Sequence, residues 1–79
     1  MEGRQQMRPY GEALSEWMRD RGYDAPTLAR EASLSVSLVR KLRQGQREPS
    51  PLAGMLLARL GAPRPSYIER DGRPVAVVE

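Results

Sequence analysis

Residues 24–50 read DAPTLAREASLSVSLVRKLRQGQREPS, and this stretch decides the fold. Asp24 is placed to cap a helix, because its side chain can accept a hydrogen bond from the first helical turn. The spacing of the apolar residues breaks at a turn over residues 33–34, and Ser35 can cap a second helix that stops at Gly45. The stretch therefore predicts two short helices joined by a tight turn, followed by a basic loop that ends at a proline.

One further helix is expected on each side of this stretch. Apolar residues recur at helical spacing from Tyr10, and Gly22 is a natural stop. Ser50 and Pro51 form a strong helix start, with serine as the cap and proline at the first helical position, and Gly61 closes that helix. The side chains expected to form the apolar faces of the four helices are Tyr10, Ala13, Leu14, Trp17, Met18, Leu28, Ala29, Ala32, Leu34, Val39, Leu42, Leu52, Met55, Leu56, Ala58 and Leu60.

The spacing of apolar residues changes in the C-terminal segment, and the new pattern predicts a β-hairpin. Residues 67–70 and 73–78 flank Asp71-Gly72, which is among the strongest two-residue hairpin turns. The second strand is apolar on both faces, so it needs cover on both sides. It could fold back on its own helices or pair with the same strand of a second subunit. We favour pairing, because exposed strand edges recruit partners. The residues assigned to dimerisation are Tyr67, Ile68, Val75 and Val77.

The composition indicates one small domain and excludes several classes of function. A core built from 79 residues is only marginally stable alone, and dimerisation is a common remedy. Without cysteine or histidine, the chain lacks disulfides, thiolate zinc ligands and the commonest general base. No serine lies near a convincing base, and no acidic cluster has metal-loop spacing. We therefore expect no enzyme, no metal and no cofactor. We also expect no membrane partner and a cytoplasmic location, because neither a transmembrane run nor a secretion signal is present.

The positive charge is concentrated in the stretch that decides the fold. The net charge is +3, and residues 25–50 carry five basic and two acidic side chains. Every basic residue except Lys41 is arginine, whose planar guanidinium suits two-pronged contacts with phosphate and guanine. A genome that favours arginine codons explains the composition equally well, so only the clustering favours nucleic acid.

Three motifs follow one another in this stretch: LARxAxLS at 28–35, SxxxVRKL at 35–42 and GQRxPS at 45–50. With them, residues 10–62 resemble the helix-turn-helix DNA-binding domain of the phage repressor (Cro/C1, XRE) family. The resemblance implies a mainly α fold, a compact four- to five-helix bundle of the lambda-repressor type, to which this chain adds its C-terminal β-hairpin. The expected organisation is a flexible N-terminal arm at 1–9, the DNA-binding domain at 10–62 and the hairpin, as a dimerisation element, at 63–79.

The resemblance also implies that the helix at residues 35–44 lies in the major groove of double-stranded DNA. Lysine there can donate to guanine, serine can donate or accept, and valine can contact a thymine methyl group. The residues expected to face bases are Val36, Ser37, Arg40 and Lys41. Those expected to face phosphates, which set register and affinity rather than sequence, are Ser35, Arg43, Gln44, Gln46 and Arg47.

The chain departs from the family pattern at three places. Ala25 begins the second helix where the family usually has a glutamine that contacts DNA. Ser33 stands where a glycine usually adopts a left-handed backbone, at a cost of about 1 kcal/mol. Met18 and Arg43 occupy positions that in many members hold a paired arginine and glutamate, so an apolar contact is expected in place of a buried ion pair.

The expected function is therefore a small transcription regulator, most simply a repressor that binds a pseudo-palindromic operator as a homodimer and blocks polymerase. One alternative is an antitoxin that binds DNA with its helices and a toxin with its hairpin; an antirepressor is another conceivable protein partner. The chain could also be the DNA-binding fragment of a longer regulator. A last alternative is an interaction module that has lost DNA binding, which would associate weakly and without dependence on salt.

Overall fold

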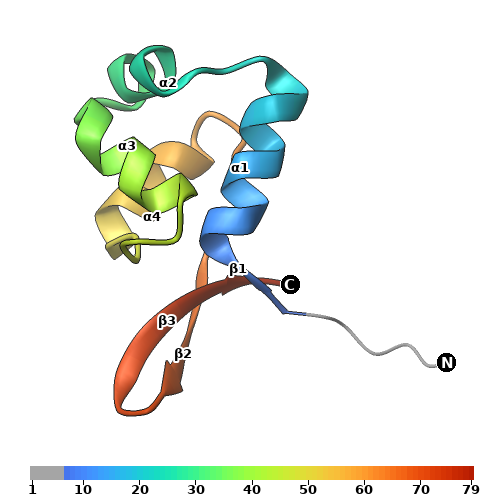
Figure 1. The fold of residues 1–79 in the computed structure, drawn as a ribbon, viewed down its shortest axis with the longest axis vertical. Coiled ribbons are helices and arrows are strands. Elements are labelled where there is room, and N and C mark those ends of the chain that lie inside the picture. Colours follow the sequence, from blue (N-terminus) through green and yellow to red (C-terminus); the bar gives the residue numbers. More distant parts are fainter. Residues whose placement is uncertain (1–6) are drawn as a thin grey trace, which may run out of the picture.

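The computed structural model describes residues 7–79, which form four helices and a three-stranded antiparallel sheet. Figure 1 shows the helices gathered on one side of the molecule and the sheet on the other. In chain order the elements are β1 (Arg8–Pro9), α1 (Tyr10–Arg21), α2 (Ala25–Ala32), α3 (Val36–Arg43), α4 (Pro51–Ala58), β2 (Ser66–Arg70) and β3 (Arg73–Val78). The helical bundle and the hairpin agree with the expected fold. The third strand makes the domain mixed α/β rather than mainly α, and within residues 7–79 there are four helices, without a fifth.

The three expected helix caps are all present, and they explain where the helices begin. The Oδ1 atom of Asp24 accepts from the backbone N–H of Thr27 at 2.9 Å, and this bond holds the pKa of the carboxyl below its usual value. The hydroxyl of Ser35 accepts from the N–H of Leu38 at 3.0 Å, and that of Ser50 from the N–H of Ala53 at 3.1 Å. Each cap satisfies a backbone donor that the helix itself leaves without a partner.

The turn between α2 and α3 has the left-handed backbone expected at Ser33, with φ 61°. The N–H of Ser33 bonds the carbonyl of Arg30 at 3.3 Å, and the N–H of Leu34 bonds that of Ala29 at 2.8 Å. These two bonds close the end of α2 in spite of the strain at a residue with a side chain.

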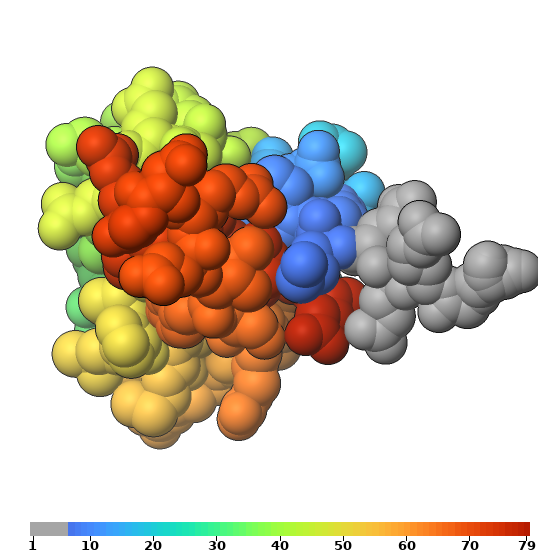
Figure 2. All heavy atoms as spheres, turned by 90° about the horizontal axis from the view of Figure 1, so that it is seen from below, coloured from blue at the N-terminus to red at the C-terminus, as the bar shows by residue number. Residues whose placement is uncertain are grey.

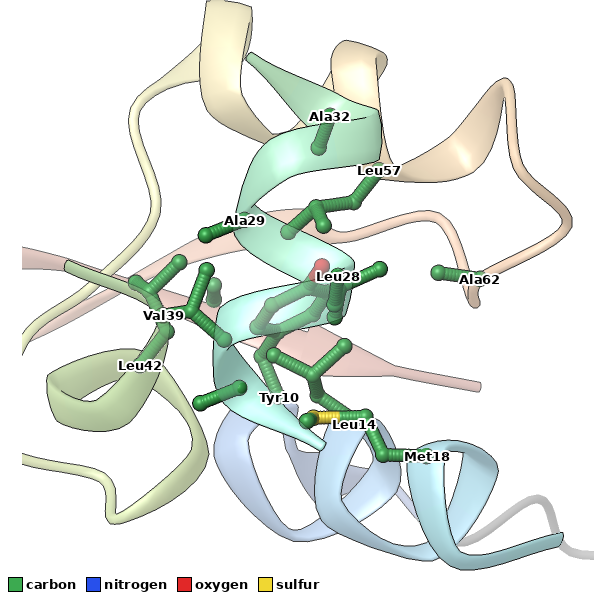
Figure 3. Close-up of a cluster of buried hydrophobic side chains, with 12 residues drawn as sticks. Tyr10, Leu14, Met18, Leu28, Ala29, Ala32, Val39, Leu42, Leu57 and Ala62 are labelled. Atoms are coloured by element: carbon green, nitrogen blue, oxygen red, sulfur yellow. The ribbon is translucent and has the colours of Figure 1, made fainter. Parts of the chain in front are cut away.

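The core lies where the four helices meet the sheet, and Figure 3 shows its side chains converging from several elements. Leu14 and Met18 from α1, Leu28 from α2 and Val39 from α3 are each fully buried. Trp17 is half-buried and packs against this core, with its ring centroid 5.3 Å from that of Tyr23. The inward faces of α1, α2 and α3 are those that the apolar spacing predicts.

The inward face of α4 is not the predicted one. Leu52 and Met55 were expected in the core, but they are 60% and 53% exposed. The buried residues are Ala53, Gly54 and Leu57. The helix is apolar around its whole circumference, so its pattern does not select a face.

The sheet has the strand order β1-β3-β2. Arg8 pairs with Val78 and Pro9 with Val77, so the end of the segment expected as a flexible arm is a strand; positions 1–6 of that arm lie outside the described residues. Asp71 and Gly72, with φ 53° and 75°, form the expected hairpin turn. Left-handed conformations at both central residues match the twist of the flanking strands.

The hairpin folds back on its own helices rather than standing free. Ala76 and Val77 are almost fully buried, and Ala76 belongs to the helical core. β3 lies between β1 and β2, and β1 covers only Val77 and Val78 along its own side of that strand. The fold therefore shows cover for this strand from its own chain, while contact of Tyr67, Ile68, Val75 and Val77 with a second subunit stays a prediction. A dimer by another surface stays a prediction.

Candidate nucleic-acid interface

Helix α3 separates a buried face from an exposed one. Val39 and Leu42 are completely buried, three residues apart on one side of the helix. Ser37, Arg40 and Lys41 are exposed on the other side. Two core residues thus fix the orientation of a short rod, and its outer face carries two cations and a hydroxyl.

The other residues assigned to DNA contact differ in their exposure to solvent. Val36, at the start of α3, is half-buried and packs against the core. Arg43, at its end, is also half-buried. The remaining residues assigned to phosphate contact are all exposed: Ser35, Gln44, Gln46 and Arg47. The structure therefore brings the nine predicted residues together on α3 and the start of the loop behind it.

The basic side chains of this surface have no acidic partner within residues 7–79. No ion pair and no side-chain hydrogen bond in that part of the chain involves Arg40, Lys41, Arg43 or Arg47. By contrast, Arg8 on the sheet side binds two carboxylates of α1. Glu48 lies in the same loop, but these four positive charges form no ion pair among the described residues and are available to an anionic partner.

An open hollow adjoins this surface between α1, the start of α2 and the end of α3. It is lined by Ser15, Asp24, Ala25, Pro26, Arg40, Arg43 and Gln44. Ala25 is buried here and carries only a methyl group, so the contact that a glutamine would make at this position is absent. Two arginines on one wall make the hollow cationic in spite of the single carboxylate at the cap of α2.

The side chain of Met18 on α1 has the apolar surroundings expected for it. Met18 is completely buried among the core side chains. Arg43 carries no carboxylate partner in the described part of the chain, so its guanidinium can turn toward the surface.

Sequence reasoning missed a close approach between α1 and the end of α3. A Cβ atom on Gly11 would lie 2.5 Å from the carbonyl oxygen of Leu42 and 3.0 Å from the backbone nitrogen of Gly45. Glycine therefore lets α1 rest against the segment where α3 gives way to its loop. An isolated glycine in the first turn of a helix was the available signal, but it does not indicate which segment comes close.

Two other residues of this region were missed or assigned another role. The carboxylate of Glu48 accepts from the N–H of Ala76, and the hydroxyl of Tyr67 donates to the carbonyl of Pro49, each at 2.8 Å. Tyr67 was expected to contact a second subunit, and the bond of its hydroxyl to the loop after α3 was not predicted. Glu48 and Ala76 are 28 residues apart in the chain, and Pro49 and Tyr67 are 18 residues apart, so local sequence patterns do not predict these contacts.

Within residues 7–79 no helix combines the length and the apolar character that crossing a membrane requires. The chain matches no family model, no curated protein and no solved structure.

Proposed function

We propose that this protein is a sequence-specific DNA-binding transcription regulator, with α3 as the helix that enters the major groove. The observation that supports the proposal is the orientation of α3. Val39 and Leu42 fix its inner face, while Ser37, Arg40 and Lys41 are exposed without an acidic partner among the described residues. An eight-residue helix that presents hydrogen-bond donors on a rigid bundle is the arrangement that reads base edges.

The proposal assigns two roles on this surface. Val36, Ser37, Arg40 and Lys41 face base edges and provide sequence preference. Ser35, Arg43, Gln44, Gln46 and Arg47 face the sugar-phosphate backbone and provide register and affinity. The protein would act at the nucleoid as a homodimer on a pseudo-palindromic operator. Its two copies of α3 would enter successive major grooves about 34 Å apart and block polymerase.

The residues exposed on α4 and β2 support a protein partner of some kind. Leu52, Met55 and Tyr67 are 60%, 53% and 40% exposed, and β2 is an edge strand of the sheet. Large apolar side chains exposed together mark contact surfaces. A second copy of the chain is the partner that the repressor proposal requires. A toxin bound at this surface is the second candidate, and copurification of a different small protein would favour it.

The direct test is a gel-shift titration of the protein against the DNA upstream of its own gene, at two salt concentrations and with a scrambled duplex as control. We expect tight binding to one segment, weaker binding to the scrambled duplex, and a steep loss of affinity at the higher salt concentration, because each phosphate contact releases counterions. Binding that is equally weak on both duplexes and insensitive to salt would identify an interaction module instead.

A further inference from the structure

The loop between α3 and α4 is tied to the C-terminal hairpin at two adjacent residues. Glu48 accepts from the N–H of Ala76 on β3, and the carbonyl of Pro49 accepts from the hydroxyl of Tyr67 on β2. Figure 2 shows the hairpin, in orange and red, lying directly against the yellow-green segment that contains this loop. The hairpin therefore contacts the loop immediately after Gln46 and Arg47.

The bond from Glu48 satisfies a backbone donor that the sheet leaves open. β1 has only two residues and pairs with β3 at Val77 and Val78, so it does not extend to Ala76. The side chain of Glu48 supplies the acceptor that a longer strand would have provided. A buried N–H without a partner is costly, so this contact holds the loop firmly on the sheet.

The same loop is also held at its other end. The N–H of Gln46 bonds the carbonyl of Lys41 at 2.9 Å, which ties the start of the loop to the last turn of α3. Arg47 therefore lies between two fixed points, with Gln46 before it and Glu48 after it. Its own side chain is exposed and has no carboxylate partner within residues 7–79.

We propose that Glu48 is a positioning residue for DNA binding and that, with Tyr67, it makes the hairpin the support that holds Arg47 at the DNA backbone. This inference deepens the proposed function and rests on it. An acidic side chain beside a DNA-facing surface opposes binding by its charge. Its hydrogen bond to the sheet gives a physical reason for a carboxylate at this place.

Two substitutions of Glu48 that both remove its negative charge distinguish a role in positioning the loop from a purely electrostatic effect on DNA binding. Glu48→Gln removes the charge and keeps an oxygen acceptor for the N–H of Ala76, whereas Glu48→Ala removes both. If charge alone matters, both variants bind DNA more tightly than the original protein. If Glu48 positions the loop, Glu48→Gln binds at least as tightly, while Glu48→Ala binds roughly fivefold to tenfold more weakly on specific and random duplexes alike. Equal affinity of the two variants overturns the proposal.

A readout without DNA keeps this inference distinct from the proposed function. We expect amide exchange and backbone ¹⁵N relaxation of the free protein to show greater mobility at Gln46 and Arg47 in Glu48→Ala, and unchanged mobility in Glu48→Gln. If the original protein binds no DNA, the proposed function is wrong, and Glu48 then has no role in DNA binding either. The amide data then decide separately whether Glu48 orders the loop, and unchanged mobility in Glu48→Ala excludes the support altogether.

Tyr67→Phe and Glu69→Ala complete the experiment. Tyr67→Phe removes only the hydroxyl that binds Pro49 and keeps the ring, so it tests the second tie even if Glu48→Ala fails to fold. It should weaken binding in the same uniform way. Glu69→Ala removes an equal charge from an exposed position of the same hairpin, and it should leave the loop dynamics unchanged.

Discussion

At the scale of single residues, the hydroxyl of Tyr10 and the indole nitrogen of Trp17 are the two buried side-chain polar atoms of residues 7–79 that have no hydrogen-bond partner. The side chain of Tyr10 is 1% exposed, and its oxygen has no hydrogen-bond partner there. Figure 3 shows the ring surrounded by apolar side chains of the core. Burial raises the pKa of this hydroxyl far above its ordinary value near 10, since ionisation would place an unpaired charge in the core.

Tyr10→Phe should therefore fold at least as stably as the original protein at neutral pH, with a gain of up to about 1 kcal/mol, because it removes an unpartnered polar group. A raised pKa in the folded state stabilises the protein below the pKa of the unfolded chain, and this contribution is lost as pH rises beyond it. The original protein should thus lose more stability than Tyr10→Phe above pH 10. Urea unfolding at pH 7 and at pH 10.5 measures both effects. A destabilisation of more than 1 kcal/mol at pH 7 would show that the hydroxyl has a partner after all.

Lys41 allows a prediction about how a single residue recognises a base. It is exposed on the outer face of α3, and an ammonium group there can donate to guanine O6 or N7. Lys41→Ala should cost roughly 1–3 kcal/mol on the operator and relax the preference at one base position. Competition titrations with operators changed one base pair at a time detect this. A loss of the same size on random DNA would reassign Lys41 to phosphate contact. Arg64→Ala, which removes a positive charge from the exposed connector after α4, is the matched control.

At the scale of elements, we expect a substitution in the loop after α3 to affect DNA binding differently from a substitution on the helix. Arg47 is exposed in that loop and is assigned to a phosphate. Arg47→Ala should weaken binding to all duplexes by a similar factor and should reduce the slope of log affinity against log salt concentration by about 0.9, the value for one phosphate contact. Affinity titrations over a range of salt concentrations measure the slope. A loss confined to the operator would mean that Arg47 reads a base.

The elements also show where sequence reasoning succeeds and where it stops. Asp24, Ser35 and Ser50 cap helices through bonds that span three residues, so local sequence contains the whole signal. The face of α3 is equally local, because Val39 and Leu42 alternate with polar residues at helical spacing. The three caps and the inward face of α3 were therefore predicted correctly.

The errors concern contacts between distant segments. The inner face of α4 is selected by the connector that lies against it: a Cβ atom on Gly54 would be 2.6 Å from the Cγ atom of Pro65. Two residues at the start of the described chain complete the sheet, and Glu48 binds a strand 28 residues away. Helical periodicity cannot identify the buried face of a helix that is apolar all round. It also does not show which strand the carboxylate of a distant loop will bind.

At the scale of the whole molecule, the division of surfaces argues for separate DNA-binding and protein-binding faces. The exposed cations and hydroxyl lie on α3, whereas the exposed apolar residues Leu52, Met55 and Tyr67 lie on α4 and β2. Deleting the hairpin would not test dimerisation cleanly, because Ala76 belongs to the core and the truncated chain would lose stability. A surface substitution that leaves the core intact is the sharper experiment.

Met55→Glu is that substitution. Met55 is 53% exposed, so a glutamate there costs the folded monomer little, but in a dimer interface it would place two like charges in an apolar contact. We expect sedimentation velocity to show a dimer for the original protein and a monomer for Met55→Glu, while circular dichroism shows that the variant is still folded. Gln46→Glu introduces the same charge at an exposed residue of the DNA-facing loop, and it should leave the dimer intact. A dimer that persists in Met55→Glu would exclude this surface.

Because two half-sites bound together gain affinity beyond either alone, Met55→Glu should also bind a full operator no more tightly than one half-site.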